Sequence, residues 1–506
     1  MLLLFLFLLM SKSSLANNIE SKHCRYINTI ILFGANYLNN KEKEKLILDY
    51  QKRCLTLNDI NDITKQITNY YIEKGYITTQ AFISEQTLTN KTLTIQIIEG
   101  KINKIIIDDS SKILSAIIFP SYKEKVLNLR DLEQGLEQLN RLTTSQYTME
   151  IQASDKVGYS SVFINKVHKK FPLNSQLTID NSGSKSTGEI VLTSSTILDS
   201  LLGLGEQWSF LFNSNIDFSN SHHQRAYSAS VNIPYGYWFY QYQISHHRSV
   251  HPLKSNYNSY PHKTSNTNQQ IDIRRLVYRD KQQKIITGIA LKYKKLKTQL
   301  AHQKLLISSP ILTSFLFTPQ YQLNFVNGYF IINPTAEIGL SLLGASPDYI
   351  ADNSPRNHYK KLSINVIFQY RLPKDFIYLS SFYGQHTPDN LYSVEKISLG
   401  GLNSIRGYKT QSLNANKGFY WRNEINTPWL NSFVGKWKFS VAVDYGVANS
   451  DQYQTKQQTL LGSAVGASFS KSIFSSQVLI NKPLFYPPSF SQPNRWTLSW
   501  SISIAI

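Results

Sequence analysis

Two charged residues, Arg406 and Asp444, have types and surroundings that suit a buried ion pair. Asp444 lies in the stretch FSVAVDYGVA, residues 439–448, in which large apolar residues alternate with small or polar ones. This alternation is the period of a β-strand, and it places Asp444 on the face of small residues. A lone carboxylate on such a face needs a cationic partner. Arg406 is the candidate, because its planar guanidinium can bind a carboxylate through two parallel hydrogen bonds.

The segment before this strand supplies the arginine and a second strand. Residues 398–426 read SLGGLNSIRGYKTQSLNANKGFYWRNEIN, with a glycine pair ahead of the motif Ile405, Arg406, Gly407 and Tyr408. From Phe419 onward apolar and polar residues alternate again, which predicts a strand with Arg422 and Glu424 on its polar face. A half-buried strand of a soluble protein has the same pattern, and Arg-Gly pairs are common in turns, so these residues alone leave the fold open.

No other group of residues suggests catalysis or a cofactor. The sequence has no phosphate-binding loop, zinc-peptidase helix or nucleophile elbow, so we expect a protein that is not an enzyme and needs no cofactor. The pairs His222-His223 and His246-His247 have no cluster of cysteines or carboxylates beside them, so we expect no metal site. Residues 246–270 are rich in Ser, Asn and His, and we expect them to form a long extracellular loop.

The composition excludes two classes of protein. The chain has 506 residues and a formal net charge of +20, and its mean hydropathy is −0.27. No apolar run of about 18 residues follows the N-terminal region, which argues against transmembrane helices but not against a membrane barrel. Lysines and arginines are spread along the chain without a nucleic-acid-binding module, so nucleic acid is not an expected partner.

The N-terminus has the pattern of an export signal. Residues 2–10 form an apolar core, and Ser14 and Ala16 are small residues at the positions that determine cleavage. These features predict a signal peptide over residues 1–16, although no Lys or Arg precedes the core. The chain has two cysteines, Cys24 and Cys54, and an even number in an exported protein predicts a disulfide between them.

Two similar α/β segments follow the signal. In the first, residues 17–100, two helices lie among strand patterns, and Asn58 is expected to cap the second helix. In the second, residues 101–172, a helix over 129–142 aligns Leu132, Leu136 and Leu139 on one face. Two such units of about 75 residues form an internal repeat.

The remaining residues, 173–506, are predicted to form an all-β transmembrane barrel of about 16 antiparallel strands. Short alternating stretches fill this region, and the last of them places six apolar residues on one face: Trp496, Leu498, Trp500, Ile502, Ile504 and Ile506. Tyr and Trp near strand ends suit the interfacial girdles of an outer-membrane barrel. A soluble sandwich is the alternative, but it rarely carries so many aromatic faces.

These motifs together resemble a known family. The IRGY motif after GG, the FYWRNE strand and the DYG strand resemble outer-membrane transporters of two-partner secretion, which include the filamentous haemagglutinin transporter and the haemolysin secretion/activation proteins. The phrases YYIEKGYITTQAFI and LNLRDLEQGLEQLNRL resemble the two POTRA domains of that family. The resemblance implies that Arg406 lies at the tip of a loop around residues 400–418, folded into the barrel. It also implies that Arg406 pairs with the Asp-x-Gly of Asp444 and Gly446.

The resemblance also implies a function. It suggests an outer-membrane translocase that secretes a large unfolded exoprotein, a TpsA-like partner that the POTRA domains bind in the periplasm, and it leaves open whether the protein activates this cargo. We expect a monomer in outer-membrane lipid. An insertase resembling BamA and a passive solute pore are the alternatives. Two features depart from the family: no room precedes Cys24 for an N-terminal plug helix, and the last residue is Ile506 instead of an aromatic.

Overall fold

The computed structural model describes residues 24–108, 112–169, 171–216, 222–254, 258–349, 354–409, 411–450, 456–490 and 495–505. The predicted signal peptide, the segment that precedes Cys24 and the terminal Ile506 lie outside these ranges. Among the described residues, no helix has the length and apolar character of a membrane span.

The first small domain packs two helices against a three-stranded sheet. Its elements are β1 (Arg25–Ile27), β2 (Thr29–Phe33), α1 (Asn40–Ile47), β3 (Arg53–Leu55), α2 (Leu57–Glu73), β4 (Gln80–Phe82) and β5 (Thr92–Ile98). The sheet order is β2-β5-β4, with β2 parallel and β4 antiparallel to β5, while β1 pairs with β3. Helix α2 buries Ile63, Ile67 and Tyr71 completely, because these residues recur on one helical face.

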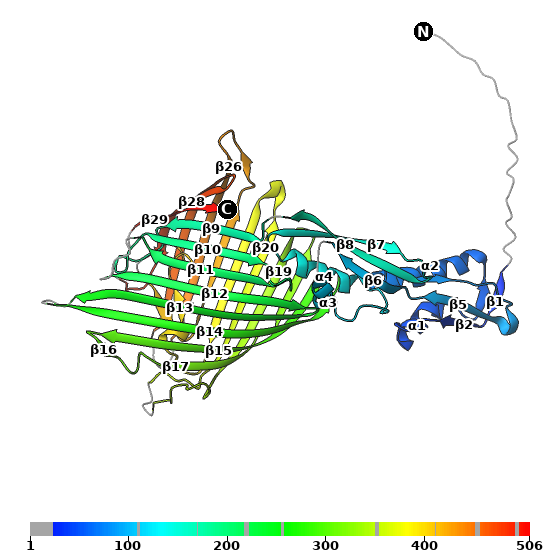
Figure 1. Cartoon of the computed structure of the whole chain (residues 1–506), viewed down its shortest axis with the longest axis horizontal. Coiled ribbons are helices and arrows are strands. Elements are labelled where there is room, and N and C mark those ends of the chain that lie inside the picture. Colours follow the sequence, from blue (N-terminus) through cyan, green and yellow to red (C-terminus); the bar gives the residue numbers. More distant parts are fainter. Residues whose placement is uncertain are drawn as a thin grey trace, which may run out of the picture. The chain divides into compact units, whose positions relative to one another are not determined.

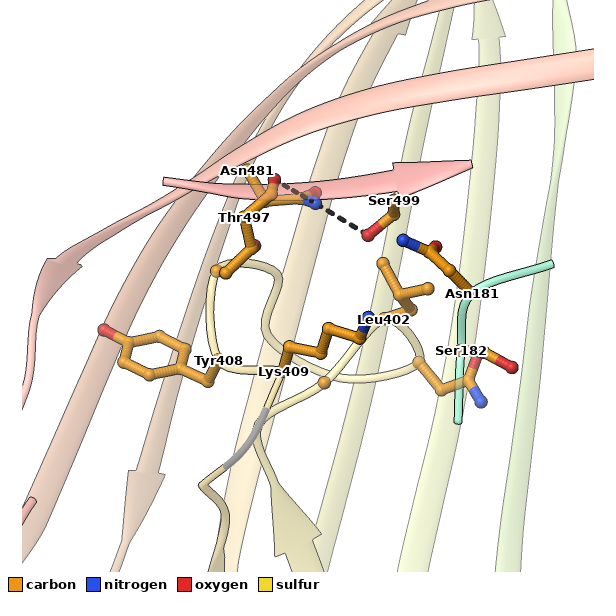
Figure 2. Close-up of a pocket in the computed structure, with 11 residues that line it drawn as sticks. Asn181, Ser182, Leu402, Tyr408, Lys409, Asn481, Thr497 and Ser499 are labelled. Atoms are coloured by element: carbon orange, nitrogen blue, oxygen red, sulfur yellow. Dashed lines mark hydrogen bonds between the residues drawn. The ribbon is translucent and has the colours of Figure 1, made fainter. Parts of the chain in front are cut away.

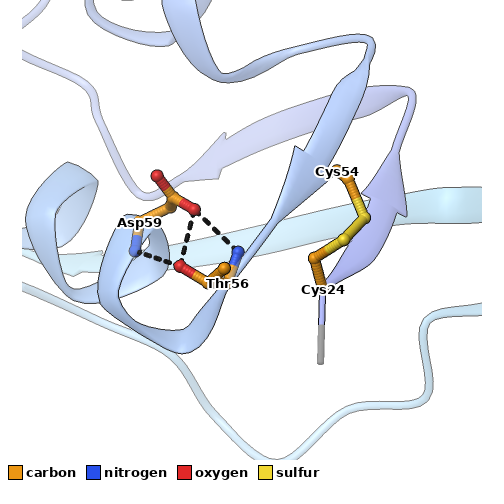
Figure 3. Close-up of a disulfide and its surroundings, with 4 residues drawn as sticks. All are labelled: Cys24, Cys54, Thr56 and Asp59. Atoms are coloured by element: carbon orange, nitrogen blue, oxygen red, sulfur yellow. Dashed lines mark hydrogen bonds between the residues drawn. A yellow bond between two sulfur atoms is a disulfide. The ribbon is translucent and has the colours of Figure 1, made fainter. Parts of the chain in front are cut away.

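The start of α2 differs from the prediction. The N-cap is Thr56, and Asn58 lies inside the helix. The Thr56 hydroxyl accepts a hydrogen bond from the Asp59 N–H at 3.2 Å, and Asp59 accepts one from the Thr56 N–H at 2.8 Å (Figure 3). This reciprocal capping box needs a partner carboxylate three residues after the cap, which Thr56 has.

A disulfide joins the two cysteines, as predicted. Cys24 and Cys54 are 30 residues apart and their Cα atoms lie 5.3 Å from each other (Figure 3). Cys54 lies in β3, opposite Tyr26 of β1. The disulfide therefore links the residue just before β1 to β3.

The second small domain repeats the arrangement with a sheet of order β6-β8-β7. Its elements are β6 (Lys101–Ile107), α3 (Lys112–Ile118), α4 (Leu129–Asn140), β7 (Ser145–Ala153) and β8 (Tyr159–Lys169). Leu132 and Leu139 of α4 are fully buried, as their helical spacing predicts. Gly135 lies against the ring of Phe119, and a Cβ at that position would overlap the ring.

The rest of the chain forms a closed antiparallel barrel (Figure 1). Sixteen strands form the barrel wall in the described part of the chain. They are β9 (Leu173–Asp180), β10 (Val191–Asp199), β11 (Gln207–Asn215), β12 (His223–Tyr235), β13 (Trp238–Lys254), β14 (Ser259–Arg279), β15 (Gln283–Leu300), the successive segments β17 (Ile311–Phe317) and β18 (Gln320–Phe325), β19 (Gly328–Leu340), β20 (Lys360–Arg371), β21 (Ile377–His386), β24 (Gly418–Asn426), β26 (Lys436–Ala448), β27 (Gln458–Lys471), β28 (Phe474–Phe485) and β29 (Thr497–Ala505). The segments β16 (Gln303–Lys304) and β25 (Leu430–Asn431) only extend hairpins, and β29 pairs with β9 to close the wall.

The two faces of the wall follow the predicted alternation. In β26, Phe439, Val441, Val443 and Tyr445 are exposed, whereas Ser440, Ala442 and Asp444 are buried. Val447 departs from the pattern, because it is 3% exposed although it shares parity with these exposed residues. The exposed apolar face is the one that meets lipid in such a barrel, so the buried face lines the interior.

The expected long loop at residues 246–270 is wrong. Strands β13 and β14 continue through most of it, in register from Trp238 and Arg275 to Lys254 and Ser259. A strand that is polar on both faces carries no alternation, so its sequence looks like a loop although its backbone hydrogen bonds are those of a ladder.

Candidate functional site

A long segment between β21 and β24, residues 387–417, packs on the interior face of the barrel. It contains a 3₁₀ turn, Ser393–Glu395, and a short hairpin of β22 (Ile397–Leu399) and β23 (Leu413–Ala415). We call this segment the interior loop. Its apolar residues form a buried cluster with two residues of the wall: Ile397, Leu399, Ile405, Tyr408, Leu413 and Ala415 with Ala448 and Leu460. The sequence predicted a loop around residues 400–418. In the structure the loop begins about a dozen residues earlier, directly after β21.

The structure brings the predicted arginine and aspartate together. The guanidinium of Arg406 donates two hydrogen bonds to Asp444, from Nε to Oδ2 and from Nη2 to Oδ1, both at 2.7 Å. The backbone N–H of Arg406 donates a third to Oδ2 at 2.9 Å. Arg406 is 3% exposed and Asp444 is completely buried. This bidentate geometry fixes orientation as well as charge.

A second carboxylate completes the site. Glu424 of β24 accepts a hydrogen bond from Nη1 of Arg406, so one arginine from the loop binds carboxylates on two adjacent strands. Arg422 lies opposite Asp444 in the β24–β26 register, and its Nε is 3.9 Å from Oδ1. Nη1 of Arg422 also donates to the carbonyl oxygen of Asn403 at 3.3 Å. The predicted interior face of β24 therefore contacts the loop tip.

Glycines allow the loop tip to reach the wall. At Gly446, the last residue of the Asp-x-Gly motif, a Cβ would overlap the side chain of Ile405, which is fully buried. At Gly462 in β27, a Cβ would overlap the carbonyl oxygen of Arg406. Gly407 has φ of +103° and would carry its Cβ 2.7 Å from the nitrogen of Pro483, so both its conformation and its surroundings need glycine.

Tyr408 binds the wall at a β-bulge. The pairing of β27 with β28 shifts register between Leu461 and Gly462. The hydroxyl of Tyr408 lies 2.8 Å from the carbonyl oxygen of Leu461 and also contacts that of Phe485. Because a bulge disturbs the ladder, a hydroxyl there can satisfy a carbonyl oxygen that the ladder serves poorly.

The loop tip also borders the seam where the barrel closes. A cavity of about 210 Å³ lies there. It is lined by the loop residues Leu402 and Lys409 and by Asn181, Asn481 and Ser499 of the wall (Figure 2). The side chain of Asn181 extends the seam, because its Nδ2 donates to the Leu498 carbonyl at 2.8 Å and its Oδ1 accepts from the Trp500 N–H at 2.9 Å.

Several contacts of the loop were not predicted from the sequence. Gly462 was missed, and so was a buried group of charges around Glu395 that includes three lysines of the wall: Lys292, Lys294 and Lys361. Lys292 and Lys294 share parity with Gly288 and Ala290, a small-residue face like that of Asp444, and this was the available signal. Within the described ranges, no three His, Cys, Asp or Glu residues lie together as metal ligands would.

Comparisons with known proteins agree with this architecture. Residues 158–469 match the family of the haemolysin secretion/activation protein ShlB/FhaC/HecB. Residues 26–100 match the ShlB-type POTRA domain, and residues 101–153 match a further POTRA domain.

Individual relatives span nearly the whole chain. The outer membrane transporter CdiB of Dickeya dadantii is 33% identical over 497 residues, covering 97% of this chain and 88% of the relative. The hemolysin transporter protein ShlB of Serratia marcescens is 29% identical over 453 residues, covering 84% of this chain and 80% of the relative. The solved structure of CdiB from Escherichia coli is 30% identical, with a TM-score of 0.91 over 98% of this chain and 93% of that one.

The family and barrel predictions are thus confirmed, and they favour secretion over an insertase or a solute pore. Members of this family serve secreted TpsA-like exoproteins through their POTRA domains. The chain belongs to the ShlB/FhaC/HecB family and is an outer-membrane transporter of two-partner secretion, with POTRA domains in the periplasm.

Proposed function

We propose that the interior loop controls passage of the cargo and that the pair of Arg406 and Asp444 holds the loop in place. The observation that carries this proposal is the bidentate contact at 2.7 Å in a site from which water is nearly excluded. An unpaired charge left in such a site costs about 3–5 kcal/mol when fully buried, so the loop leaves the wall only when both ions are rehydrated or find new partners.

The cargo we propose is a large unfolded exoprotein, of the kind that the haemolysin transporters serve. The sheet of the first POTRA domain has β2 and β4 at its edges. An extended segment of cargo can add to such an edge through main-chain hydrogen bonds, which suits a chain that has not yet folded. The barrel interior then offers a polar path, with the exposed apolar face of the wall in lipid.

The proposed transport needs no catalysis and no cofactor. Binding of the cargo and its folding outside the cell supply the free energy, and nucleic acid has no part in the process. One barrel closes on itself through β9 and β29, so a monomer is sufficient.

A secretion assay tests the role of the pair. Arg406→Ala, Asp444→Ala and the double variant are compared at matched outer-membrane levels, with Arg371→Ala, an exposed arginine of β20, as the control. We expect both single variants to lose most secretion and the double variant to be little worse, because all three remove one interaction. Fully additive losses would show that the two residues act separately.

Deletion of residues 17–170 tests the role of the POTRA domains. We expect the remaining barrel to assemble and to secrete nothing. Assembly is measured as a difference in migration on a denaturing gel between heated and unheated samples. Continued secretion by this truncated protein would remove cargo binding from the POTRA domains.

A further inference from the structure

The base of the interior loop carries a buried glutamate that faces the wall. Glu395 ends the 3₁₀ turn Ser393–Glu395, and its side chain is 2% exposed. Its Oε1 lies 2.6 Å from Nζ of Lys294, and its Oε2 lies 2.6 Å from Nζ of Lys361 and 3.3 Å from Nζ of Lys292. The two lysines at 292 and 294 belong to β15 and the third belongs to β20.

A carboxylate of the wall shares the same lysines. Glu337 of β19 contacts Lys292 and lies 2.9 Å from Nζ of Lys361. The hydroxyls of Ser314 and Tyr359 each donate a hydrogen bond to Glu337 at 2.7 Å. The cluster therefore holds three ammonium groups and two carboxylates, and Glu395 is the member that the loop contributes.

The charge balance of the cluster depends on the loop. With Glu395 in place, the five groups sum to one positive charge, and without it they sum to two positive charges in a site that water barely reaches. Burial alone would raise the pKa of Glu395, but the three lysines hold that pKa well below its usual range, so the side chain is ionised. Withdrawal of Glu395 would leave the lysines repelling one another with a single carboxylate between them.

Hydrogen bonds between uncharged groups also join the first and the last part of the interior loop at its base. Nε2 of Gln385, at the end of β21, donates to the carbonyl oxygen of Glu395 at 3.0 Å and to that of Asn416 at 3.2 Å. The side chain of Asn416 in turn accepts a hydrogen bond from the Leu391 N–H at 2.9 Å. The start and the end of the loop are thus joined beside the charge cluster.

The cluster lies on a different part of the wall from the tip site. Arg406 binds β24 and β26, whereas Glu395 binds β15 and β20, and β21 separates β20 from β24. The two sites share no charged residue. The loop is therefore attached to the wall twice, through independent groups.

We propose that Glu395 is a second anchor, which holds the base of the interior loop against β15 and β20 independently of the Arg406 site. This proposal rests on the gating role of the loop proposed above. Release of the tip then leaves the base attached, so the loop clears the interior in two separate steps. Glu395 is a positioning residue that acts by electrostatic attraction to the three lysines.

Site-resolved labelling tests the second anchor in the full chain. Two reporters are introduced separately, Ala415→Cys for the base and Ser404→Cys for the tip; both positions are buried, at 2% and 5% exposure. The native cysteines are joined in a disulfide and do not react with a maleimide. Each reporter is combined with Glu395→Gln, with Arg406→Ala, with both, or with Lys360→Met, an exposed lysine next to Lys361 that serves as control.

We expect Glu395→Gln to raise the labelling rate of the base reporter about tenfold, the factor that 1.4 kcal/mol gives, and to leave the tip reporter near its original rate. Arg406→Ala should have the opposite pattern, and the control should change neither rate. An unchanged base reporter in assembled Glu395→Gln protein would overturn the second anchor. Equal rises at both reporters in each single variant would also overturn it, because the loop would then be held as one unit.

Two further measurements keep the test decisive. If Glu395→Gln does not assemble, Lys294→Met removes a different member of the cluster, and the same labelling pattern is expected. Secretion by the same variants separates this proposal from the gating role: the predicted labelling together with normal secretion supports the second anchor and removes control of transport from the loop.

Discussion

The tip and the base of the interior loop are both bound by buried ions, but with the signs reversed. At the tip the loop supplies one arginine and the wall supplies two carboxylates, Asp444 and Glu424. At the base the loop supplies one carboxylate and the wall supplies three lysines. A planar guanidinium accepts few geometries, whereas ammonium groups act as point charges that tolerate small shifts. The tip site therefore fixes the position of the loop, and the base site supplies attraction with looser geometry.

The largest effect is expected from Asp444→Asn. This change keeps the size of the side chain but leaves Arg406 and Arg422 with Glu424 as their carboxylate, at a cost of about 3–5 kcal/mol if the site stays dry. We expect near-complete loss of secretion from a barrel that still assembles.

Exchange of arginine and lysine tests the difference between the two sites. Because the tip needs directional hydrogen bonds, Arg406→Lys should retain little secretion, whereas Lys361→Arg at the base should secrete nearly normally. Equal tolerance at both sites, measured in the secretion assay, would erase the distinction between the anchors.

A substitution in the wall can test the position of the loop tip without changing any charge. Gly462→Ala places a methyl group against the Arg406 carbonyl, and overpacking of this kind costs about 1–3 kcal/mol. We expect increased labelling of the tip reporter without a change at the base. Gly384→Ala in β21 is the matched control, since its Cβ would meet its nearest neighbour at 3.2 Å. Normal labelling of the tip in Gly462→Ala would mean that the wall does not set the position of the loop.

Gln385→Leu is expected to weaken the base without touching its charges. The change leaves two buried carbonyl oxygens, of Glu395 and Asn416, without the amide that serves them, at a cost of about 1–3 kcal/mol. The base reporter should label several times faster, by less than in Glu395→Gln. A larger effect than that of Glu395→Gln would show that neutral hydrogen bonds, and not charge, dominate the base.

The smallest effect is expected from Tyr408→Phe. It removes one hydroxyl that lies against the Leu461 carbonyl, worth about 1 kcal/mol, while the ring stays in the buried cluster. We expect a modest rise in labelling of the tip reporter and secretion close to normal. A loss as severe as that of Asp444→Asn would place Tyr408, and not Arg406, at the centre of the tip site.

The contrast between the anchors also explains what could be predicted from the sequence. Asp444 stands out within one strand, because the two-residue period assigns it to the small-residue face, and Arg406 lies in a compact motif. The base cluster draws on residues 292, 294, 337, 361 and 395, and only the register of several strands brings them together. That register is set by pairing along the whole wall, which no local pattern contains.

Local errors have local causes. The strand ends of β13 and β14 were predicted as a loop, because both of their faces are polar beyond the apolar belt. The helix start was displaced by two residues, because Asn58 is a good capping residue but lacks the reciprocal carboxylate that Thr56 finds in Asp59.

The glycine contacts of the tip have a consequence for the pore current. At Gly462 and Gly407 the backbone of the loop tip lies against the backbone of the wall. A change of side-chain rotamer therefore cannot make room for the tip to shift along the wall. The bound position of the tip is set by these backbone contacts, and we expect the tip to be either bound in this position or fully released. In a planar bilayer, openings of a single channel would therefore appear as jumps between a few fixed conductance levels, and not as a drift through a continuous range.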